Sequence, residues 1–279
     1  MNEETGGPRV VLNNGVEIPQ VGFGVFQIPE EGAQSAVESA LAAGYRHIDT
    51  AAAYNNEKEV GAAIAASGIP RDELFITTKL ANPDLASGEI IPPFDASLEK
   101  LGLDYVDLYL IHWPMPANDL YIQAWRQFER FYGEHSARAI GVSNFLVPHL
   151  ETLLAATDIV PAVNQVELHP MFQQRELHEY AARHGIAVEA WGPLGQGKYD
   201  LFGIPAIQQI AAAHGKSPAQ IVIRWHLQTG NIVIPKSNSR ERMQENFEVF
   251  DFELSPAEFE AMTALDENRR VGGNPAEVN

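Results

Sequence analysis

The chain has 279 residues, of which 37 are acidic and 19 are basic, so its formal net charge is −18. A surface this acidic is unsuited to phosphate backbones and anionic membranes, so nucleic-acid and membrane partners are not expected. The absence of cysteine excludes disulfides, thiolate nucleophiles, zinc–thiolate sites and iron–sulfur clusters. The polar start has no apolar leader segment, and no apolar run is long enough to span a bilayer, so we expect a soluble, cytoplasmic protein.

Short strand-like runs alternate with helix-like stretches along the whole chain. Eight runs are predicted as strands: 21–26, 47–50, 74–80, 105–112, 139–143, 162–168, 187–191 and 232–235. Residues 106–111 are almost continuously apolar, which is typical of parallel strands buried on both faces. Eight βα units predict an α/β protein, a (β/α)8 TIM barrel. An open doubly wound sheet is the alternative, but Gly22 and Gly24 lack the third glycine of the dinucleotide fingerprint. No linker marks a boundary, so we expect a single domain over residues 1–279, with 1–8 flexible.

Two segments lie outside the repeat. Residues 10–18 predict an N-terminal β-hairpin whose Asn-Gly turn supplies a positive φ and which plugs the bottom of the barrel. Two helical stretches, 205–214 and 217–229, precede the eighth strand where the repeat needs one, so one of them is extra. Further helices are expected after that strand, at 240–249 and 255–265. The last opens on Ser-Pro-Ala-Glu, a favourable helix start.

Polar side chains stand where three predicted strands end. Asp49, Lys79 and His112 close the second, third and fourth runs, and Tyr54 follows the second run by a few residues. In a barrel of this type the chemistry belongs at the carboxyl ends of the strands. Because buried charges need partners, Asp49 and Lys79 are expected to pair at equivalent height, as a structural ion pair or as part of a site. A cationic Lys79 would lower the pKa of the Tyr54 phenol, and His112 would orient a substrate oxygen.

Three longer segments resemble the signatures of one enzyme family. They are residues 44–61, 140–145 and 234–246, and they occur in that family's order. Over roughly residues 8–279 the chain resembles the aldo-keto reductases. The resemblance implies a monomeric barrel that binds NADP(H) and reduces aldehydes or ketones, with Tyr54 protonating the carbonyl oxygen as hydride arrives. The catalytic residues that it implies are Asp49, Tyr54, Lys79 and His112.

The same resemblance implies the cofactor-binding residues. They are Ser143, Asn144, Gln165, Trp191, Gly192, Pro193, Leu194, Gly195, Lys236, Ser237, Arg242, Glu245 and Asn246. The first three match positions that hold the nicotinamide carboxamide, Trp191 matches the aromatic that stacks on the ring, and residues 192–197 match a loop across the pyrophosphate. Independently, Lys236, Arg240 and Arg242 form a basic cluster in an acidic chain, which suits a phosphate monoester. NADPH is therefore favoured over NADH.

A narrower resemblance concerns the substrate. Residues 11–20, 147–151 and 191–202 resemble the bacterial 2,5-diketo-D-gluconate reductases, which implies a keto sugar acid or another small dicarbonyl as substrate. The expected substrate-binding residues are Phe23, Phe26, Ala81, His112 and Trp113. Ala81 stands where family members commonly carry tryptophan. The loss of an indole would enlarge or reshape the substrate pocket, so the substrate specificity of those relatives cannot be assumed for this chain.

Two other functions remain open at this point. A noncatalytic NADP(H)-binding regulatory barrel could keep the fold, and a phosphate-sugar isomerase or aldolase could use it, because fold alone does not set function. No metal is expected, since no His-Glu-x-x-His or comparable ligand spacing occurs. His47 and His169 are interpreted as ordinary structural histidines, and Trp125 and Trp225 as core residues.

Overall fold

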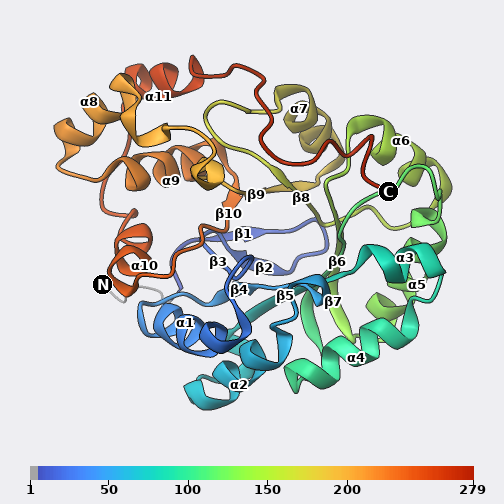
Figure 1. Ribbon diagram of the computed structural model, residues 1–279. Helices are drawn as coiled ribbons and strands as arrows, with labels where there is room; N and C mark the ends of the chain where they lie inside the picture. Colours follow the sequence, from blue (N-terminus) through green and yellow to red (C-terminus); the bar gives the residue numbers. More distant parts are fainter. Residues whose placement is uncertain (1–5) are drawn as a thin grey trace.

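A barrel of eight parallel strands forms the centre of the computed structural model, which describes residues 6–279 (Figure 1). The strands are β3 (Phe23–Gly24), β4 (His47–Asp49), β5 (Phe75–Leu80), β6 (Val106–Ile111), β7 (Ala137–Ser143), β8 (Val163–Glu167), β9 (Ala187–Trp191) and β10 (Ile232–Val233). They pair in chain order, each parallel to the next. The predicted (β/α)8 barrel is confirmed, and the open doubly wound sheet is excluded.

The ring closes where the first strand meets the last. Val21 forms a parallel bridge with Val233. The Gly22 amide donates to the Val233 carbonyl at 2.8 Å, and the Val233 amide donates to the Gln20 carbonyl at 2.9 Å. Both strands at this seam have only two residues, so few hydrogen bonds join the two ends of the sheet.

Helices cover the outside of the barrel (Figure 1). They are α1 (Glu30–Ala42), α2 (Glu57–Ser67), α3 (Asn82–Ser87), α4 (Ile91–Leu101), α5 (Tyr121–Gly133), α6 (Val147–Ala156), α7 (Arg175–His184), α8 (Pro205–His214), α9 (Pro218–Thr229), α10 (Arg240–Phe247) and α11 (Pro256–Thr263). Helices α8 and α9 both precede β10, as predicted. The Ser255 hydroxyl caps α11 and Glu258 completes the capping box, also as predicted. Trp125 and Trp225 are buried in the core.

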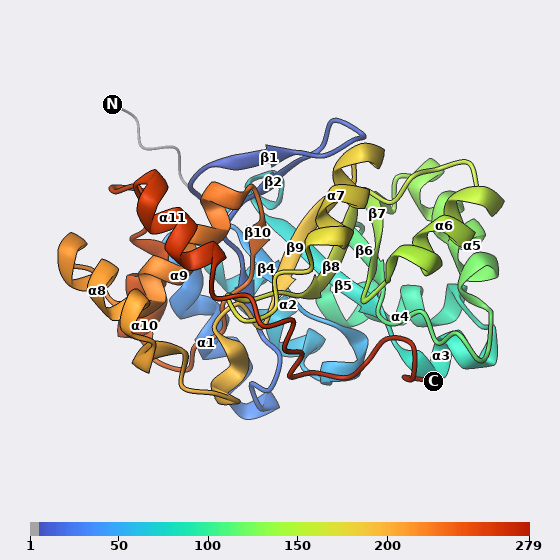
Figure 2. The ribbon, with the colours of Figure 1, turned by 90° about the horizontal axis from the view of Figure 1, so that it is seen from above.

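The N-terminal hairpin closes the amino end of the barrel (Figure 2). It consists of β1 (Arg9–Val11) and β2 (Glu17–Pro19), and its Leu12 and Ile18 pack into an apolar cluster with strand residues such as Leu108. Gly15 supplies the positive φ of the turn, at +83°. Its amide donates to the Leu12 carbonyl at 2.9 Å. The predicted plug is therefore present.

Residues 6–8 pack onto the barrel. A Cβ at Gly7 would lie 2.6 Å from the ring of Phe250, and the Pro8 carbonyl accepts from the Gln20 amide at 2.8 Å. These contacts join residues 6–8 to the barrel, while the expected flexibility of residues 1–8 stays a prediction, and residues 1–5 lie outside the described part. Within residues 6–279, no helix has the length and apolarity needed to cross a membrane.

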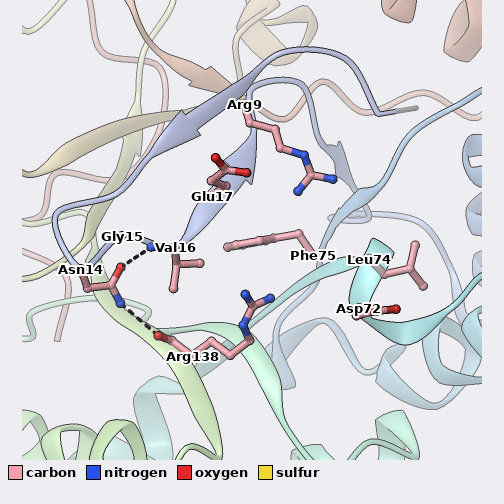
Figure 3. A pocket seen from close by; sticks show the side chains of 9 residues that line it. All are labelled: Arg9, Asn14, Gly15, Val16, Glu17, Asp72, Leu74, Phe75 and Arg138. Carbon is pink, nitrogen blue, oxygen red and sulfur yellow. Dashed lines mark hydrogen bonds between the residues drawn. The ribbon is translucent and has the colours of Figure 1, made fainter. Parts of the chain in front are cut away.

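A polar cavity of about 420 Å³ lies at the amino end, beneath the hairpin (Figure 3). Arg9 and Arg138 line it together with Glu17 and Asp72, so its charges balance. The Asn14 side-chain amide donates to the Arg138 carbonyl at 3.0 Å and thereby ties the hairpin to β7 (Figure 3). This cavity lies at the opposite end of the barrel from the predicted site residues.

Candidate active site

Three of the four predicted catalytic side chains form one hydrogen-bonded group at the carboxyl end of the barrel. The Lys79 ammonium donates to Asp49 Oδ1 at 2.6 Å, to the Thr50 carbonyl at 2.9 Å and to the Tyr54 hydroxyl at 3.4 Å. Lys79 and Asp49 are almost completely buried, whereas Tyr54 is half-buried. Because the ammonium donates to the phenol oxygen, the phenol proton remains available to another acceptor.

The pairing of Asp49 with Lys79 does not follow from equal height. The register of β4 and β5 places Asp49 beside Thr77, and Lys79 lies two residues further along, beside Leu110 of β6. The expected equivalence of height is therefore wrong. The long lysine side chain reaches back across the strand pair to the carboxylate, which a flexible four-carbon stem allows.

His112 completes the group without a side-chain hydrogen bond among the described residues. It follows β6, is half-buried, and its ring centroid lies 5.6 Å from that of Tyr54. The Asn144 side-chain amide donates to the His112 carbonyl at 2.9 Å and holds its backbone. Burial, and then the charge of Lys79, lower the pKa of His112 to about 3. Its imidazole is therefore neutral at physiological pH and can donate one N–H.

The electrostatics of Tyr54 differ from the prediction. Desolvation raises the pKa of the phenol above its ordinary value, and the neighbouring Asp49 raises it further, while the charge and hydrogen bond of Lys79 lower it. Lys79 thus lowers this pKa as predicted, but burial outweighs its effect and the net direction is upward, so a phenol with a pKa below its ordinary value is not what the structure has. Burial alone would lower the pKa of Lys79. The charges of Asp49 and Tyr54 outweigh burial, so the net shift of the Lys79 pKa is upward. The phenol thus stays protonated beside a lysine that stays charged.

Gln165 links this group to a second buried carboxyl that the sequence analysis missed. Its side-chain amide donates to Asp49 Oδ2 at 2.7 Å and to Glu189 Oε2 at 3.0 Å. Glu189 is completely buried, and its Oε1 lies 3.6 Å from Nε2 of His47. Burial, and then the charge of Asp49, raise the pKa of Glu189. The available signal was a glutamate inside an otherwise apolar strand, where a buried charge is costly.

The predicted carboxamide-binding residues and the predicted stacking aromatic lie together. Ser143 pairs with Gln165 in the sheet, and its hydroxyl donates to the Gln165 carbonyl at 2.8 Å. Asn144 has a left-handed backbone, with φ of +63°, and its Oδ1 accepts from the indole N–H of Trp191 at 2.8 Å. That bond fixes the orientation of the half-buried indole. The Asn144 carbonyl keeps a second lone pair for a further donor.

A basic cluster, Lys236, Arg240 and Arg242, lies just after β10. All three side chains are exposed, and within residues 6–279 none has a carboxylate partner within 4.0 Å. The cluster surrounds the start of α10, whose N-cap hydroxyl on Ser239 accepts from the Arg242 amide at 3.4 Å. Buried Ser237 accepts from the Ser239 amide at 3.1 Å. Unpaired cations at a helix N-terminus suit an anion such as a phosphate.

Two further predicted cofactor residues lie on α10, and four others begin the loop after β9. Asn246 is buried and Glu245 half-buried. The loop is rich in left-handed residues: Gly192, Gly195, Gln196 and Gly197 all have positive φ values. This conformation lets the backbone fold tightly at the mouth of the barrel.

The predicted substrate-binding residues divide into two groups. Phe26 is 44% exposed, with its ring centroid 5.1 Å from that of Tyr54, and half-buried Trp113 directly follows His112. Ala81 is buried at the end of β5. The prediction for Phe23 is wrong: its side chain points toward the helices, packs against Tyr45 and is 1% exposed. Adjacent residues of a strand point to opposite sides, and Phe23 is on the outer one.

The C-terminal segment is a part of the site that was not predicted. Residues 268–279 have no regular secondary structure and cross the barrel end opposite the hairpin (Figure 2). A Cβ at Gly272 would lie 2.4 Å from the indole of Trp191, and one at Gly273 would lie 3.3 Å from Trp113. The pair of glycines was the only local signal of such close packing.

The buried histidines contact protein groups. Nε2 of His47 lies 3.2 Å from the Thr77 hydroxyl, and Nε2 of His169 lies 3.1 Å from Glu167. Across residues 6–279, no three or more histidine or acidic side chains are grouped so that they could hold a metal ion.

Comparison with known proteins matches this geometry to one family. The family model described as "Aldo/keto reductase family" matches residues 20–267. An aldo-keto reductase of Mycolicibacterium smegmatis is 53% identical, with 98% of each chain covered. "Methylglyoxal reductase DkgA" of Yersinia pestis is 51% identical, with 96% of each chain covered. A mutant of Gox0644, solved in complex with NADPH, has a TM-score of 0.92 at 40% identity, with 98% of each chain covered. The chain therefore belongs to the aldo/keto reductase family.

Proposed function

We propose that this protein reduces an aldehyde or ketone to an alcohol with NADPH. The observation that carries the proposal is the hydrogen bond from the Lys79 ammonium to the Tyr54 hydroxyl. It leaves the phenol proton free at a half-exposed position beside neutral His112. This proton can be given to a carbonyl oxygen as negative charge develops on it.

Each of the four residues has a part in this step. NADPH, when bound, supplies a hydride to the carbonyl carbon. Tyr54 donates its proton to the oxygen, and His112 donates an N–H bond that orients the same oxygen. Lys79 stabilises the phenolate that the transfer leaves, and Asp49 keeps Lys79 charged. Hydride and proton together convert the carbonyl to the alcohol.

The residues of the site fit this cofactor. Gln165 uses both amide hydrogens on carboxylates, so its Oε1 can accept from the nicotinamide carboxamide. Ser143 and Asn144 flank it, and Trp191 offers an indole face held in place by Asn144. The loop that includes Gly192, Pro193, Leu194 and Gly195 would cover the pyrophosphate.

The basic cluster is proposed to bind the phosphate that distinguishes NADPH from NADH, with the Ser237 hydroxyl, Glu245 and Asn246 close by. In support, a relative solved with NADPH shares the fold at a TM-score of 0.92. Lys236→Ala is expected to lower the affinity for NADPH about tenfold and to change the affinity for NADH little, because a charge-assisted hydrogen bond contributes about 1.5 kcal/mol or more. Arg242→Ala should behave alike, and exposed Lys58→Ala on α2 is the control. Dissociation constants from quenching of tryptophan fluorescence decide this, and equal losses for both cofactors would contradict the phosphate site.

The substrate is proposed to be a small dicarbonyl or a keto sugar acid such as 2,5-diketo-D-gluconate, taken up by a monomer. The methylglyoxal reductase of Yersinia pestis supports this class. Phe26, Ala81, His112 and Trp113 would contact the substrate.

NADPH oxidation measured with 2,5-diketo-D-gluconate, methylglyoxal, aromatic aldehydes and simple ketones tests the function. Turnover of the first two well above the others is the expected result. Tight NADPH binding with no carbonyl-dependent oxidation would instead indicate a regulatory barrel protein.

A further inference from the structure

A buried glutamate at the end of β8 holds the C-terminal segment. The Glu167 carboxylate accepts from the Val271 amide at 2.6 Å and from the Gly272 amide at 2.8 Å. Burial opposes its ionisation, but these bonds and the one to His169 outweigh burial and lower the pKa of Glu167. The carboxylate is therefore charged, and its two oxygens fasten consecutive amides of an otherwise irregular segment.

The same carboxylate fixes the tautomer of a buried histidine. Nε2 of His169 lies 3.1 Å from Glu167 Oε1, and Nδ1 lies 2.8 Å from the Tyr199 hydroxyl. An ionised carboxylate can only accept, so Nε2 carries the hydrogen. In the neutral ring Nδ1 then accepts from the Tyr199 hydroxyl. A continuous chain of hydrogen bonds thus runs from Tyr199 through His169 and Glu167 to two backbone amides.

The two ends of this chain belong to different walls of the site. Tyr199 is part of the loop after β9, where a Cβ at Gly195 would lie 2.6 Å from its ring. At the other end, a Cβ at Gly272 would lie 2.4 Å from the Trp191 indole and 2.7 Å from Glu167 Oε2. Only glycine fits between that carboxylate and that indole. A displacement of Gly272 therefore has to displace Trp191 or leave a gap beside it.

We propose that Glu167, His169 and Tyr199 are positioning residues that join the loop after β9 to the C-terminal wall of the substrate pocket. They act through Gly272, which packs against Trp191. In this way they keep the positions of the indole and of the C-terminal segment fixed relative to the loop after β9. The part of this inference that concerns substrate rests on the proposed carbonyl reduction. The part that concerns the C-terminal segment does not.

Tyr199→Phe tests the chain at its far end. The variant removes one hydroxyl and leaves every direct contact of Glu167 with the C-terminal segment in place. If this series of hydrogen bonds stabilises the C-terminal segment, its loss at Tyr199 should make the Val271 and Gly272 amides exchange hydrogen about fivefold faster. This is the effect of losing one ordinary hydrogen bond. The KM for a carbonyl substrate should rise by a similar factor with kcat almost unchanged, because the chemical group is intact.

Two further variants make the outcome decisive. Tyr132→Phe is the control, since Tyr132 lies on α5 and its hydroxyl has no hydrogen bond among the described residues; amide exchange and KM should both stay at wild-type values. Glu167→Gln replaces one acceptor by a donor and should accelerate the same amides more strongly than Tyr199→Phe. Hydrogen exchange is followed by mass spectrometry on the peptide covering residues 268–279.

Each result has a defined meaning. Wild-type exchange in Tyr199→Phe, with fast exchange in Glu167→Gln, would overturn the link between loop and segment. Fast exchange with an unchanged KM would overturn the role in the substrate pocket. Exchange needs no substrate, so failure of carbonyl reduction would leave the exchange result standing, and the two failures can be told apart.

Discussion

Each end of the barrel holds a buried aspartate in an ion pair, with two arginines at the amino end and one lysine at the carboxyl end, and the two arrangements differ in what the cations contact. At the amino end, Asp107 accepts from the Ile76 amide and from the guanidinium groups of Arg71 and Arg138, at 2.6 to 2.8 Å. Both arginines extend to the surface, with 21% and 42% of their side chains exposed. The aspartate thus has three donors, and both of its guanidinium partners reach the surface.

At the carboxyl end, Asp49 pairs with a lysine that has no exposed surface. Two of the three donors of Lys79 serve the aspartate and a carbonyl, and the third reaches the half-exposed Tyr54. A buried ion pair alone does not distinguish a structural brace from a site. The comparison of the two ends shows what separates a functional ion pair from a structural one. At the carboxyl end the lysine has a further partner, the Tyr54 hydroxyl, which an incoming molecule can also contact.

Tyr54→Phe should have the largest effect on activity at the carboxyl end, because it removes the hydroxyl that Lys79 contacts. Carbonyl reduction is expected to fall by at least about a hundredfold, the usual contribution of a general acid, while NADPH still quenches tryptophan fluorescence. Steady-state NADPH oxidation measures the loss. The matched change at the amino end is Tyr105→Phe, which keeps the stacking of Tyr105 with Arg71 and should leave turnover unchanged. Substantial turnover by the Tyr54 variant would contradict its role as proton donor.

Removing one cation at each end should separate stability from activity. Lys79→Met leaves Asp49 buried without its counter-charge, which costs about 3–5 kcal/mol of unfolding free energy, and turnover is expected to be lost. Arg138→Met leaves Asp107 bonded to Arg71 and to the Ile76 amide, so the cost should be about 1 kcal/mol or less. Urea unfolding measures the free energies. A loss of kcat in the Arg138 variant would show that the amino-end pair is more than a brace.

The buried ionisable groups predict a stability maximum near neutral pH. Desolvation is the largest cause that lowers the pKa values of His47, His112 and His226 from 6.5 to about 3. Below pH 6.5 the unfolded chain binds more protons than the native one, so the free energy of unfolding falls as the pH drops toward 3. For a completely buried histidine the slope is about 1.4 kcal/mol per pH unit.

Glu189 acts in the opposite direction. Its pKa is raised from 4.5 to about 8, mainly by burial, so the native chain holds the extra proton and this stabilisation is lost as pH rises toward 8. Urea unfolding across pH checks both limbs: His226→Gln should flatten the acid limb and Glu189→Gln the alkaline one. Because His112 stays neutral, kcat/KM should show no inflection from it between about pH 5 and 8. Stability that fell steadily from acid to alkaline pH would contradict the histidine assignment.

A small effect on stability alone is expected in the hairpin that closes the amino end. Gly15→Ala puts a Cβ on a residue with φ of +83°, at a place where no atom lies within 4 Å. Only the backbone strain remains, about 1–2 kcal/mol. Thermal unfolding should shift down by a few degrees while kcat and KM stay constant. Gly133→Ala at the end of α5 is the control, since that glycine has no positive φ and equally open surroundings, and it should not be destabilised.

The sequence predicted which residues meet at the site better than how they meet. Asp49, Lys79 and His112 could be found because each ends or follows a buried strand, and strand ends converge in any parallel barrel. The two-residue offset between Asp49 and Lys79 could not, because register depends on the tilt of the strands around the closed ring. The outward orientation of Phe23, in contrast, could have been found: in the predicted strand 21–26, Phe23 and Phe26 lie three residues apart and therefore on opposite faces.

The chain from Tyr199 to Gly272 was beyond sequence reasoning for another reason. Its members are separated by up to 105 positions and meet only because an irregular segment returns across the barrel. Periodicity describes neighbours within an element and says nothing of such a return. Glu189, in contrast, was visible as a charge within an apolar strand, and the pairing rule applied to Asp49 would have identified it.

The seam between β3 and β10 has a consequence for how the protein opens. Both strands at this seam have only two residues, so we expect local opening of the barrel to begin there. The basic cluster follows β10 directly, so an anion gripped by Lys236 and by the start of α10 would fasten the chain beside this join. Cofactor binding would then hold the two ends of the sheet together. It should slow hydrogen exchange most at the Gly22 and Val233 amides, which form the hydrogen bonds of the seam.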